Sequence, residues 1–294
     1  MTIAEQSPLS RFIEEFRENR LAVAGAVVLL AILLIALTAP WISPQNPYDL
    51  AQLDIMDAKL EPGAKLGNNK IAPLGTDDQG RDMLSGIFYG LRISLFVGVA
   101  ATVLALLIGA TAGMVSAYVG GRTDNLIMRV ADIQLSFPPI LIALVLLALL
   151  GQGLGKIITA LVAVQWAYYA RTVRGAALVE RRREDIEAAQ VLGLPPARIV
   201  FRHLLPNCMP PLIVIATVQV ASAITLEATL SFLGLGLPIT EPSLGLLIAN
   251  GFNYMLSGKY WISFFPGVAL LLMIVSINLV GDQLRDVLNP RLKK

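Results

Sequence analysis

The residue with the clearest capacity for chemistry is Glu227, an acid inside a long apolar run. A carboxylate within a membrane is costly unless it is paired, hydrated or neutralised, so a functional position is the first interpretation. In that interpretation Glu227 lines a polar pathway through the protein. The alternative is a structural role, in which the carboxyl group bonds to the backbone or to a polar side chain such as Asn278. The residues alone leave both interpretations open.

Other segments contain residue types that could bind a phosphate or a metal, but these residues do not have the spacing that such sites require. Residues 151–156 superficially resemble a phosphate-binding loop, but Leu150 stands where that motif needs Gly, and Ile157 where it needs Ser or Thr. The single histidine, His203, and the single cysteine, Cys208, do not have the spacing of metal ligands. With only one cysteine, no internal disulfide can form. We therefore expect a chain that is not an enzyme, with no catalytic residue, no metal site and no cofactor of its own.

A polar, Arg-rich segment between two apolar runs carries the most informative motif. Its first part, residues 187–193, is predicted to be a helix that Gly193 ends, because Gly adopts the left-handed conformation and Pro195-Pro196 forbids continuation. A second short helix is predicted to follow and to stop at Pro206. Small side chains beside Glu187 allow another surface to approach the backbone. The candidate contact residues are Glu187, Ala188, Ala189, Gly193 and His203.

The elements that must position these residues are apolar helices. The chain is 55% hydrophobic and only 15% charged, with a mean hydropathy of +0.68, which is not the composition of a soluble domain. Runs of about 20 apolar residues span a bilayer, and a helix satisfies its own backbone there. The predicted fold is an all-α integral membrane protein with six transmembrane helices. The predicted spans are Leu21–Ala39, Ile93–Tyr118, Leu126–Leu150, Ile157–Ala170, Leu212–Leu230 and Trp261–Val280.

The basic residues predict the orientation of these spans. An even number of spans puts both termini on one side of the membrane, together with the Arg-rich segment. Most Lys and Arg residues fall on that side, which the positive-inside rule identifies as the cytoplasm. The run Arg181-Arg182-Arg183 lacks interleaved aromatic residues, so no nucleic-acid contact is expected. Residues 109–113 form a face of small side chains that permits close helix packing.

The chain is predicted to form five parts in order. They are a cytoplasmic amphipathic segment at 1–20, a first transmembrane helix at 21–39, an extracytoplasmic loop at 40–90, a transmembrane domain at 91–282 that contains the coupling segment 180–206, and a cytoplasmic tail at 283–294. The loop is rich in Pro and Gly, and Asp82 favours a helix start near its end. A cleaved signal peptide is disfavoured, because the first run is long and Ala39-Pro40-Trp41 is a poor cleavage site.

Several blocks of the sequence occur together in one order. They are LGTDDQGRDMLS and YGLRISL within residues 74–95, and further blocks within residues 120–138, 226–236 and 242–291. With the coupling segment, which resembles the "EAA" loop, they are similar to the C-type membrane subunits of the dipeptide/oligopeptide/nickel family of ABC importers. The resemblance implies the type I ABC importer transmembrane fold and places Glu227 on the helix that lines the translocation path.

The resemblance also implies partners and a location. The partners are a homologous B-type permease, two ATP-binding subunits that carry ATP and Mg, an extracytoplasmic solute-binding protein, and the lipid of a bacterial inner membrane. Di- or oligopeptides are the leading solute, with nickel, glutathione or another small solute as the alternative. A different class, an ATP-independent secondary carrier or channel, would need inverted repeats and broken helices around a midplane ion site, which the sequence does not indicate.

Overall fold

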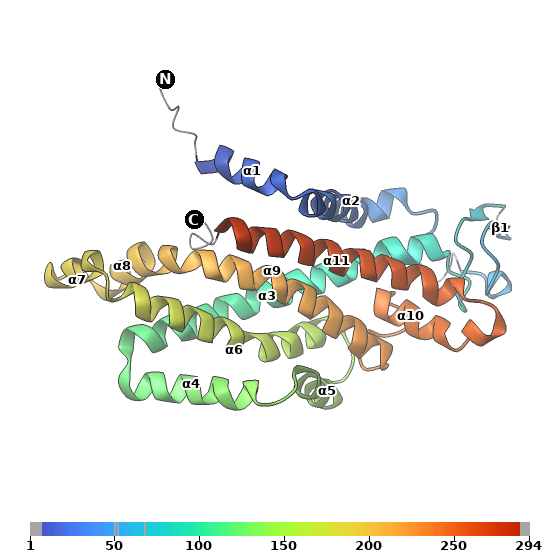
Figure 1. Cartoon of the computed structure of the whole chain (residues 1–294). Helices are drawn as coiled ribbons and strands as arrows, with labels where there is room; N and C mark the ends of the chain where they lie inside the picture. The colour runs from blue at the N-terminus through green and yellow to red at the C-terminus, as the bar shows by residue number, and fades with distance from the viewer. Residues whose placement is uncertain (1–7, 50, 52, 68, 289–294) are drawn as a thin grey trace, which may run out of the picture.

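The computed structural model describes residues 8–49, 51, 53–67 and 69–288 and is mostly helical (Figure 1). Its helices are α1 (Pro8–Glu18), α2 (Arg20–Ile42), α3 (Met83–Val119), α4 (Gly121–Leu135), α5 (Pro139–Leu150), α6 (Leu154–Glu180), α7 (Glu184–Val191), α8 (Pro196–Ile199), α9 (Leu205–Phe232), α10 (Leu244–Phe252) and α11 (Trp261–Leu288). The strands β1 (Ala64–Lys65) and β2 (Ile71–Ala72) pair antiparallel in the loop after α2. The remainder of the two predicted end segments, residues 1–7 and 289–294, lies outside the described residues.

The expected all-α membrane architecture is confirmed, although the spans differ in character. Among the described residues, four helices are long and apolar enough to cross a membrane: α2, α3, the continuous α8–α9 and α11. The bent pair α4–α5 makes a fifth if it is counted as one span. The predicted fourth span, α6, does not qualify by length and composition, although it has 27 residues. It packs between α3, α5 and α9 and buries polar groups such as Gln165, so it needs less apolar surface for lipid.

The third predicted span, residues 126–150, is wrong as a single helix. The chain bends by 92° between α4 and α5, across residues 136–138. Pro138 and Pro139 have no N–H to continue the hydrogen bonds of α4, and proline disfavours a helical conformation in the residue before it. The Ser136 hydroxyl instead donates to a carbonyl oxygen one turn earlier, at 2.7 Å. The bend separates α4, which carries charges, from the wholly apolar α5.

The small-residue face on α3 permits close helix packing, as expected. A Cβ built on Gly109 would lie 2.3 Å from the Trp166 carbonyl oxygen, and one on Gly113 would lie 2.3 Å from the Ala170 carbonyl oxygen. Both distances are far below van der Waals contact, so only glycine lets the α6 backbone approach this closely. Figure 1 shows α3 and α6 running alongside each other through the bundle.

The predicted outer loop, residues 40–90, is shorter in the structure. The helix α2 continues to Ile42, and α3 already begins at Met83. Asp82 caps α3, because its carboxylate accepts the Ser85 N–H at 2.8 Å. The expected helix start at Asp82 is therefore confirmed.

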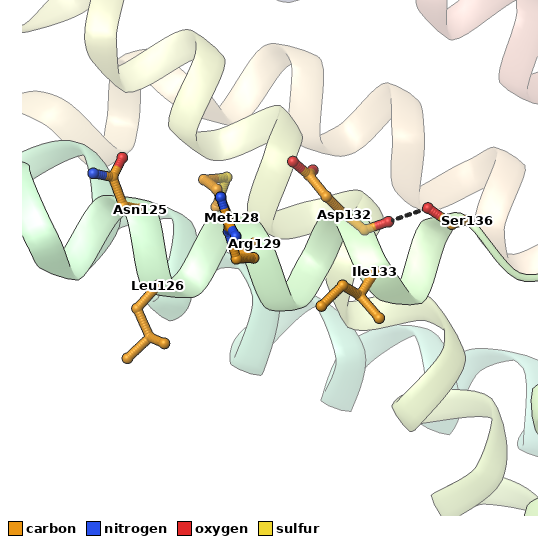
Figure 2. A pocket seen from close by; sticks show the side chains of 7 residues that line it. All are labelled: Asn125, Leu126, Met128, Arg129, Asp132, Ile133 and Ser136. Atoms are coloured by element: carbon orange, nitrogen blue, oxygen red, sulfur yellow. Dashed lines mark hydrogen bonds between the residues drawn. The ribbon is translucent and has the colours of Figure 1, made fainter.

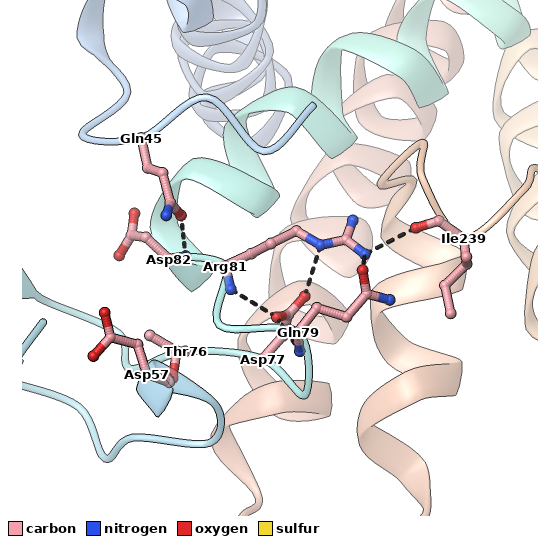
Figure 3. A network of polar contacts seen from close by, with 8 residues as sticks. All are labelled: Gln45, Asp57, Thr76, Asp77, Gln79, Arg81, Asp82 and Ile239. Carbon is pink, nitrogen blue, oxygen red and sulfur yellow. Dashed lines mark hydrogen bonds and ion pairs between the residues drawn. The ribbon is translucent and has the colours of Figure 1, made fainter. Parts of the chain in front are cut away.

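A buried ion pair fastens the outer loop to the bundle (Figure 3). The Arg81 Nε atom lies 3.3 Å from the Asp77 carboxylate, and both side chains are almost fully buried. The Arg81 Nη2 atom also donates to the Gln79 side chain and, at 2.8 Å, to the Ile239 carbonyl oxygen. Burial raises the pKa of Asp77 to about 6, against the opposing effect of the Arg81 charge. Through Arg81 the pair joins the loop before α3 to the connection between α9 and α10.

The two ends of the described chain lie together. The Asn19 side chain donates to the Gln283 side-chain oxygen at 2.9 Å, and the Gln283 amide donates to the Glu15 carbonyl oxygen at 3.1 Å. In Figure 1 the start of α2 and the end of α11 lie toward the same end of the bundle as α7 and α8.

Candidate functional site

The candidate contact segment is a short helix that projects from one end of the bundle. Figure 1 shows α7 and α8 extending beyond the long helices there. Ile186 and Ala189 are buried and pack against the core beneath α7, whereas Glu187 and Ala188 are exposed. The first turn of α7 carries Glu184, Asp185 and Glu187, and acidic groups favour a helix N-terminus. Of the two predicted contact alanines, only Ala188 faces outward, while Ala189 anchors the helix.

Gly193 ends α7 in the predicted way. Its φ is +68°, in the left-handed region that glycine adopts without strain. The Leu194 N–H donates to the Ala189 carbonyl oxygen at 3.2 Å, and the Gly193 N–H donates to the Gln190 carbonyl oxygen at 3.0 Å. These two bonds form a Schellman motif, which satisfies carbonyl groups at the end of the helix. The predicted stop at this glycine is confirmed.

The predicted stop at Pro206 is wrong. The short α8 continues through a π-helical turn, Val200–Leu204, directly into α9. The Leu205 N–H reaches back to the Val200 carbonyl oxygen across this wider turn. Pro206 follows this wider turn directly, as the second residue of α9. His203 lies within the π-helical turn and is half-buried.

Large apolar side chains cluster on the projecting segment although it lies outside the apolar runs. Val191 is 88% exposed, Leu192 78% and Phe201 69%. They stand beside charged residues at an end of the bundle, and exposed apolar groups rimmed by charge are typical of a protein contact surface. We call the exposed residues Glu187, Ala188, Val191, Leu192 and Phe201 the coupling surface.

Ionic and hydrogen-bonded contacts tie the root of this segment to the bundle. The Arg181 guanidinium donates to the Ala117 carbonyl oxygen at 2.9 Å, where α3 ends. Arg174 on α6 forms a two-pronged ion pair with Asp124 on α4, at 2.5 and 2.6 Å. Glu180 accepts a hydrogen bond from Asn207, on α9, at 3.1 Å. Displacement of the coupling surface would therefore be carried into α3, α4, α6 and α9.

Glu227 is fully buried inside this chain. The Ser94 hydroxyl on α3 donates to one carboxylate oxygen at 3.0 Å, and the Ser231 hydroxyl donates to the other at 2.7 Å. A Cβ on Gly245 of α10 would lie 2.3 Å from the Ala228 carbonyl oxygen, so α10 packs tightly on α9 beside this site. Within the described residues the carboxylate joins α3 to α9, and Asn278 is not its partner. A role for Glu227 in transport stays a prediction.

Three hollows lie on the surfaces of α4, α5, α9, α10 and α11. The first, about 810 Å³, is lined by α4 residues that include Arg129, Asp132 and Ser136 (Figure 2). The second, about 480 Å³, lies between α5, α9 and α11 and includes Pro139. The third, about 220 Å³, shares Thr225 with the second. Glu227 does not line any of these three hollows.

Polar side chains of α9 enter the second and third hollows. They are Ser222, Thr225 and Thr229, spaced so that they share one helix face, and Asn278 of α11 joins them. The hydroxyls of Thr225 and Thr229 bond to carbonyl oxygens one turn earlier, at 2.8 and 2.7 Å. The sequence already shows Thr225 and Thr229 one helical turn apart within an apolar run, and the structure adds Ser222 and Asn278 to the same row.

Comparison with known proteins gives matches over nearly the whole chain. Residues 105–294 match the family model described as "Binding-protein-dependent transport system inner membrane component", and residues 7–62 match "N-terminal TM domain of oligopeptide transport permease C". The dipeptide transport system permease protein DppC of Escherichia coli is 42% identical over 289 residues, covering 98% of this chain and 95% of the relative. The oligopeptide transport system permease protein OppC of Bacillus subtilis is 40% identical over 279 residues, covering 95% and 88%.

Solved structures share the fold at low sequence identity. A chain of the MetNI methionine ABC transporter in an inward-facing conformation has a TM-score of 0.57 and 20% identity, covering 70% of this chain and 98% of the other. A chain of an amino acid ABC transporter has a TM-score of 0.52 and 14% identity, covering 69% and 94%.

Proposed function

Because the chain belongs to the family of binding-protein-dependent transport system inner membrane components, we propose that it is one of two permease subunits of an ATP-driven peptide importer. The fold is that of the type I ABC importers. The solute proposed, a di- or oligopeptide, is the one named for the relatives that align over nearly the whole chain. Family membership makes the chain an integral membrane protein.

The observation that carries the coupling role is the coupling surface itself. It combines Glu187 and Val191, exposed on the eight-residue α7, with Leu192 at the end of α7 and Phe201 in the π-helical turn after α8. A short projecting segment of this kind fits a groove on another protein, with its exposed apolar side chains as anchors. The partner proposed to bind the coupling surface is an ATP-binding subunit. In this proposal the coupling surface and both termini lie in the cytoplasm, and the chain lies in the bacterial inner membrane.

The proposed cycle follows from how this surface is attached. A homologous permease of the B type supplies the second half of the path, two ATP-binding subunits carry ATP and Mg, and a solute-binding protein delivers the peptide outside. When the ATP-binding subunits close, they draw the two coupling segments together. The contacts of Arg181 with Ala117 and of Arg174 with Asp124 pass the displacement to α3, α4 and α6. The helices then move as rigid bodies and expose the path to the opposite side.

The test compares two changes on the coupling surface with one remote change. Leu192→Asp and Glu187→Lys are introduced into the importer assembled with its partner subunits, and Glu61→Lys, on the exposed outer loop, is the control. We expect the first two to reduce recovery of ATP-binding subunits and to uncouple hydrolysis from uptake. The reason is that a buried apolar anchor or a charge-assisted bond, worth about 1.5–3 kcal/mol, is lost.

The measurements are uptake of a labelled dipeptide into proteoliposomes and ATPase activity stimulated by the binding protein. Glu61→Lys is expected to leave both unchanged. If Leu192→Asp and Glu187→Lys assemble and transport like the wild-type importer, the coupling surface is not the docking site.

A further inference from the structure

The second and third hollows form one groove along α9. The second lies between α5, α9 and α11, the third lies between α9, α10 and α11, and Thr225 lines both. The α9 residues of this lining run from Val218 to Phe232, so the groove follows the helix for about 21 Å at a rise of 1.5 Å per residue. We call the two hollows together the α9 groove.

The lining of the α9 groove is partly polar but uncharged. It includes the hydroxyl groups of Ser222, Thr225 and Thr229, and the Asn278 amide adds a fourth polar side chain. Among the described residues that line the groove, none is Asp, Glu, Lys, Arg or His. The other side chains are apolar, and a mostly apolar hollow with a few polar groups is typical of a site for a small solute.

The polar groups lie deep within helices that are long and apolar enough to span a membrane. Ser222 lies about 15 Å along the axis from the end of α9 at Phe232. Asn278 lies about 15 Å from the end of α11 at Leu288. Within the described residues, the side chains of Ser222 and Asn278 make no hydrogen bond. An unpartnered amide or hydroxyl group is strongly unfavourable in hydrocarbon, so this groove faces water, a polar solute or another protein.

The threonine hydroxyls of the groove are placed to accept hydrogen bonds. Thr225 donates to the Ala221 carbonyl oxygen at 2.8 Å, and Thr229 donates to the Thr225 carbonyl oxygen at 2.7 Å. Each hydroxyl oxygen therefore keeps its lone pairs for a further donor, while the Asn278 amide can both donate and accept. A neighbouring membrane helix bonds its own N–H groups internally, whereas a peptide in transit brings free N–H groups.

We propose that the α9 groove is part of the solute path and that its threonine hydroxyls accept hydrogen bonds from main-chain N–H groups of the transported peptide. This rests on the proposed peptide import. The two hollows, about 480 and 220 Å³, leave room for a short peptide and water. Because the lining is uncharged and the main chain is common to all peptides, the groove accepts peptides without selecting their side chains by charge.

The first arm of the test measures access from water. Single cysteines are introduced by Asn278→Cys and, on the same helix, by Leu272→Cys, which is at a position 49% exposed that lines neither hollow. The importer is assembled in nanodiscs with partner subunits that lack cysteine, and the unmodified chain gives the blank because Cys208 is buried. We expect a charged methanethiosulfonate reagent to label Asn278→Cys and not Leu272→Cys. Saturating dipeptide during ATP turnover should slow the labelling.

The second arm measures recognition as kcat/KM for uptake into proteoliposomes. Thr225→Val removes the hydroxyl at nearly constant size and should lower kcat/KM for dialanine by about three- to tenfold, the effect of one hydrogen bond. Thr225→Ser should restore most of this loss. Thr111→Val is the matched control, because the Thr111 hydroxyl also bonds to a carbonyl oxygen one turn earlier, at 2.7 Å, but lies on α3 outside the groove. It should transport normally.

Further solutes separate a main-chain contact from a general loss of activity. Alanylglutamate and alanyllysine should show the same ratio of wild-type to Thr225→Val uptake as dialanine, because no charge lines the groove. Dialanine methylated on its peptide nitrogen should be taken up by Thr225→Val and the wild type at nearly equal kcat/KM, because it lacks the N–H donor.

Three results would overturn the proposal. Labelling of Asn278→Cys in the isolated chain but not in the assembled importer would make the groove a contact with the partner permease. No labelling of Asn278→Cys in either would show that the groove is closed to water. Uptake by Thr225→Val that equals the wild type, or that falls equally for dialanine and its N-methylated form, would remove the main-chain contact. A wild-type importer that takes up no peptide would refute the proposed function instead, while the labelling would still decide whether the groove holds water.

Discussion

Alanine at Gly109 should destabilise the protein, although alanine is the better helix former. The added Cβ would lie 2.3 Å from the Trp166 carbonyl oxygen and 2.6 Å from the Tyr169 Cβ, where ordinary contact begins at 3.4 Å. Relief of both contacts requires α3 and α6 to separate by about 1 Å along their shared face. Because this pair forms the centre of the bundle, the displacement would also disturb the packing of α9 and α4.

Two opposing free-energy contributions decide whether Gly109→Ala stabilises or destabilises the protein. Alanine in place of glycine inside a helix gains about 1 kcal/mol of helix propensity. An extra methyl group forced into a close-packed interior costs about 1–3 kcal/mol, and here the clash is with backbone that cannot rotate away. Gly175, on α6, is the matched control because a Cβ there would meet nothing within 4 Å. Gly109→Ala should therefore be destabilising, and Gly175→Ala neutral or stabilising.

The assay is thermal unfolding of the purified chain in one detergent, followed by intrinsic fluorescence. Each 1 kcal/mol corresponds to about 2–4 °C in a domain of this size, so Gly109→Ala should lower the apparent Tm by several degrees. The Tm of Gly175→Ala should equal or exceed that of the wild type. An apparent Tm for Gly109→Ala at or above the wild-type value would refute the close approach of the two backbones as the reason for this glycine.

Three further outcomes are expected. Gly193→Val should impair assembly with ATP-binding subunits more than Gly193→Asn, because a β-branched residue is strained at positive φ and Asn much less so; equal recovery of both would contradict this. Glu227→Gln should fold normally and change uptake kinetics, because the amide keeps size and polarity but loses charge; unchanged uptake and unchanged pH dependence of uptake would argue against a role in transport. Asp77→Asn should cost about 3–5 kcal/mol in thermal unfolding by leaving the buried Arg81 charge unpaired, and adding Arg81→Met should recover part of that loss. A double variant no more stable than Asp77→Asn would show that the two residues act independently.

The local features of the coupling segment could be predicted because they depend on residues close together in the sequence. At the end of α7, the Gly193 N–H donates to Gln190 and the Leu194 N–H donates to Ala189, and all four residues lie within six positions of the sequence. The start of α3 at Asp82 is likewise a contact with Ser85, three residues later. The stop at Pro206 was wrong because the chain passes through the preceding π-helical turn into α9 without a break.

The break in the third predicted span had a signal in the sequence, but the length of the apolar run outweighed it. Pro138 and Pro139 marked the break between α4 and α5, yet the apolar residues on both sides were sufficient for a continuous span. Only the folded bundle shows that α4 and α5 are separate helices that meet at an angle of 92°. The composition of α6 likewise makes sense only once its neighbours α3 and α9 are known to enclose it.

The sequence by itself determined that the chain is an all-α membrane protein with a polar segment outside its apolar helices, because hydrophobic length, glycine and proline act locally and need no knowledge of neighbours. Tertiary structure alone decided what each polar group meets. Glu227 accepts from Ser94, 133 residues away, and Arg171 reaches Asp132 across 39 residues. Such pairs depend on how the helices pack against one another. Helices of similar apolarity can pack in many ways, and the close backbone contacts at Gly109 and Gly113 select one arrangement of α3 and α6.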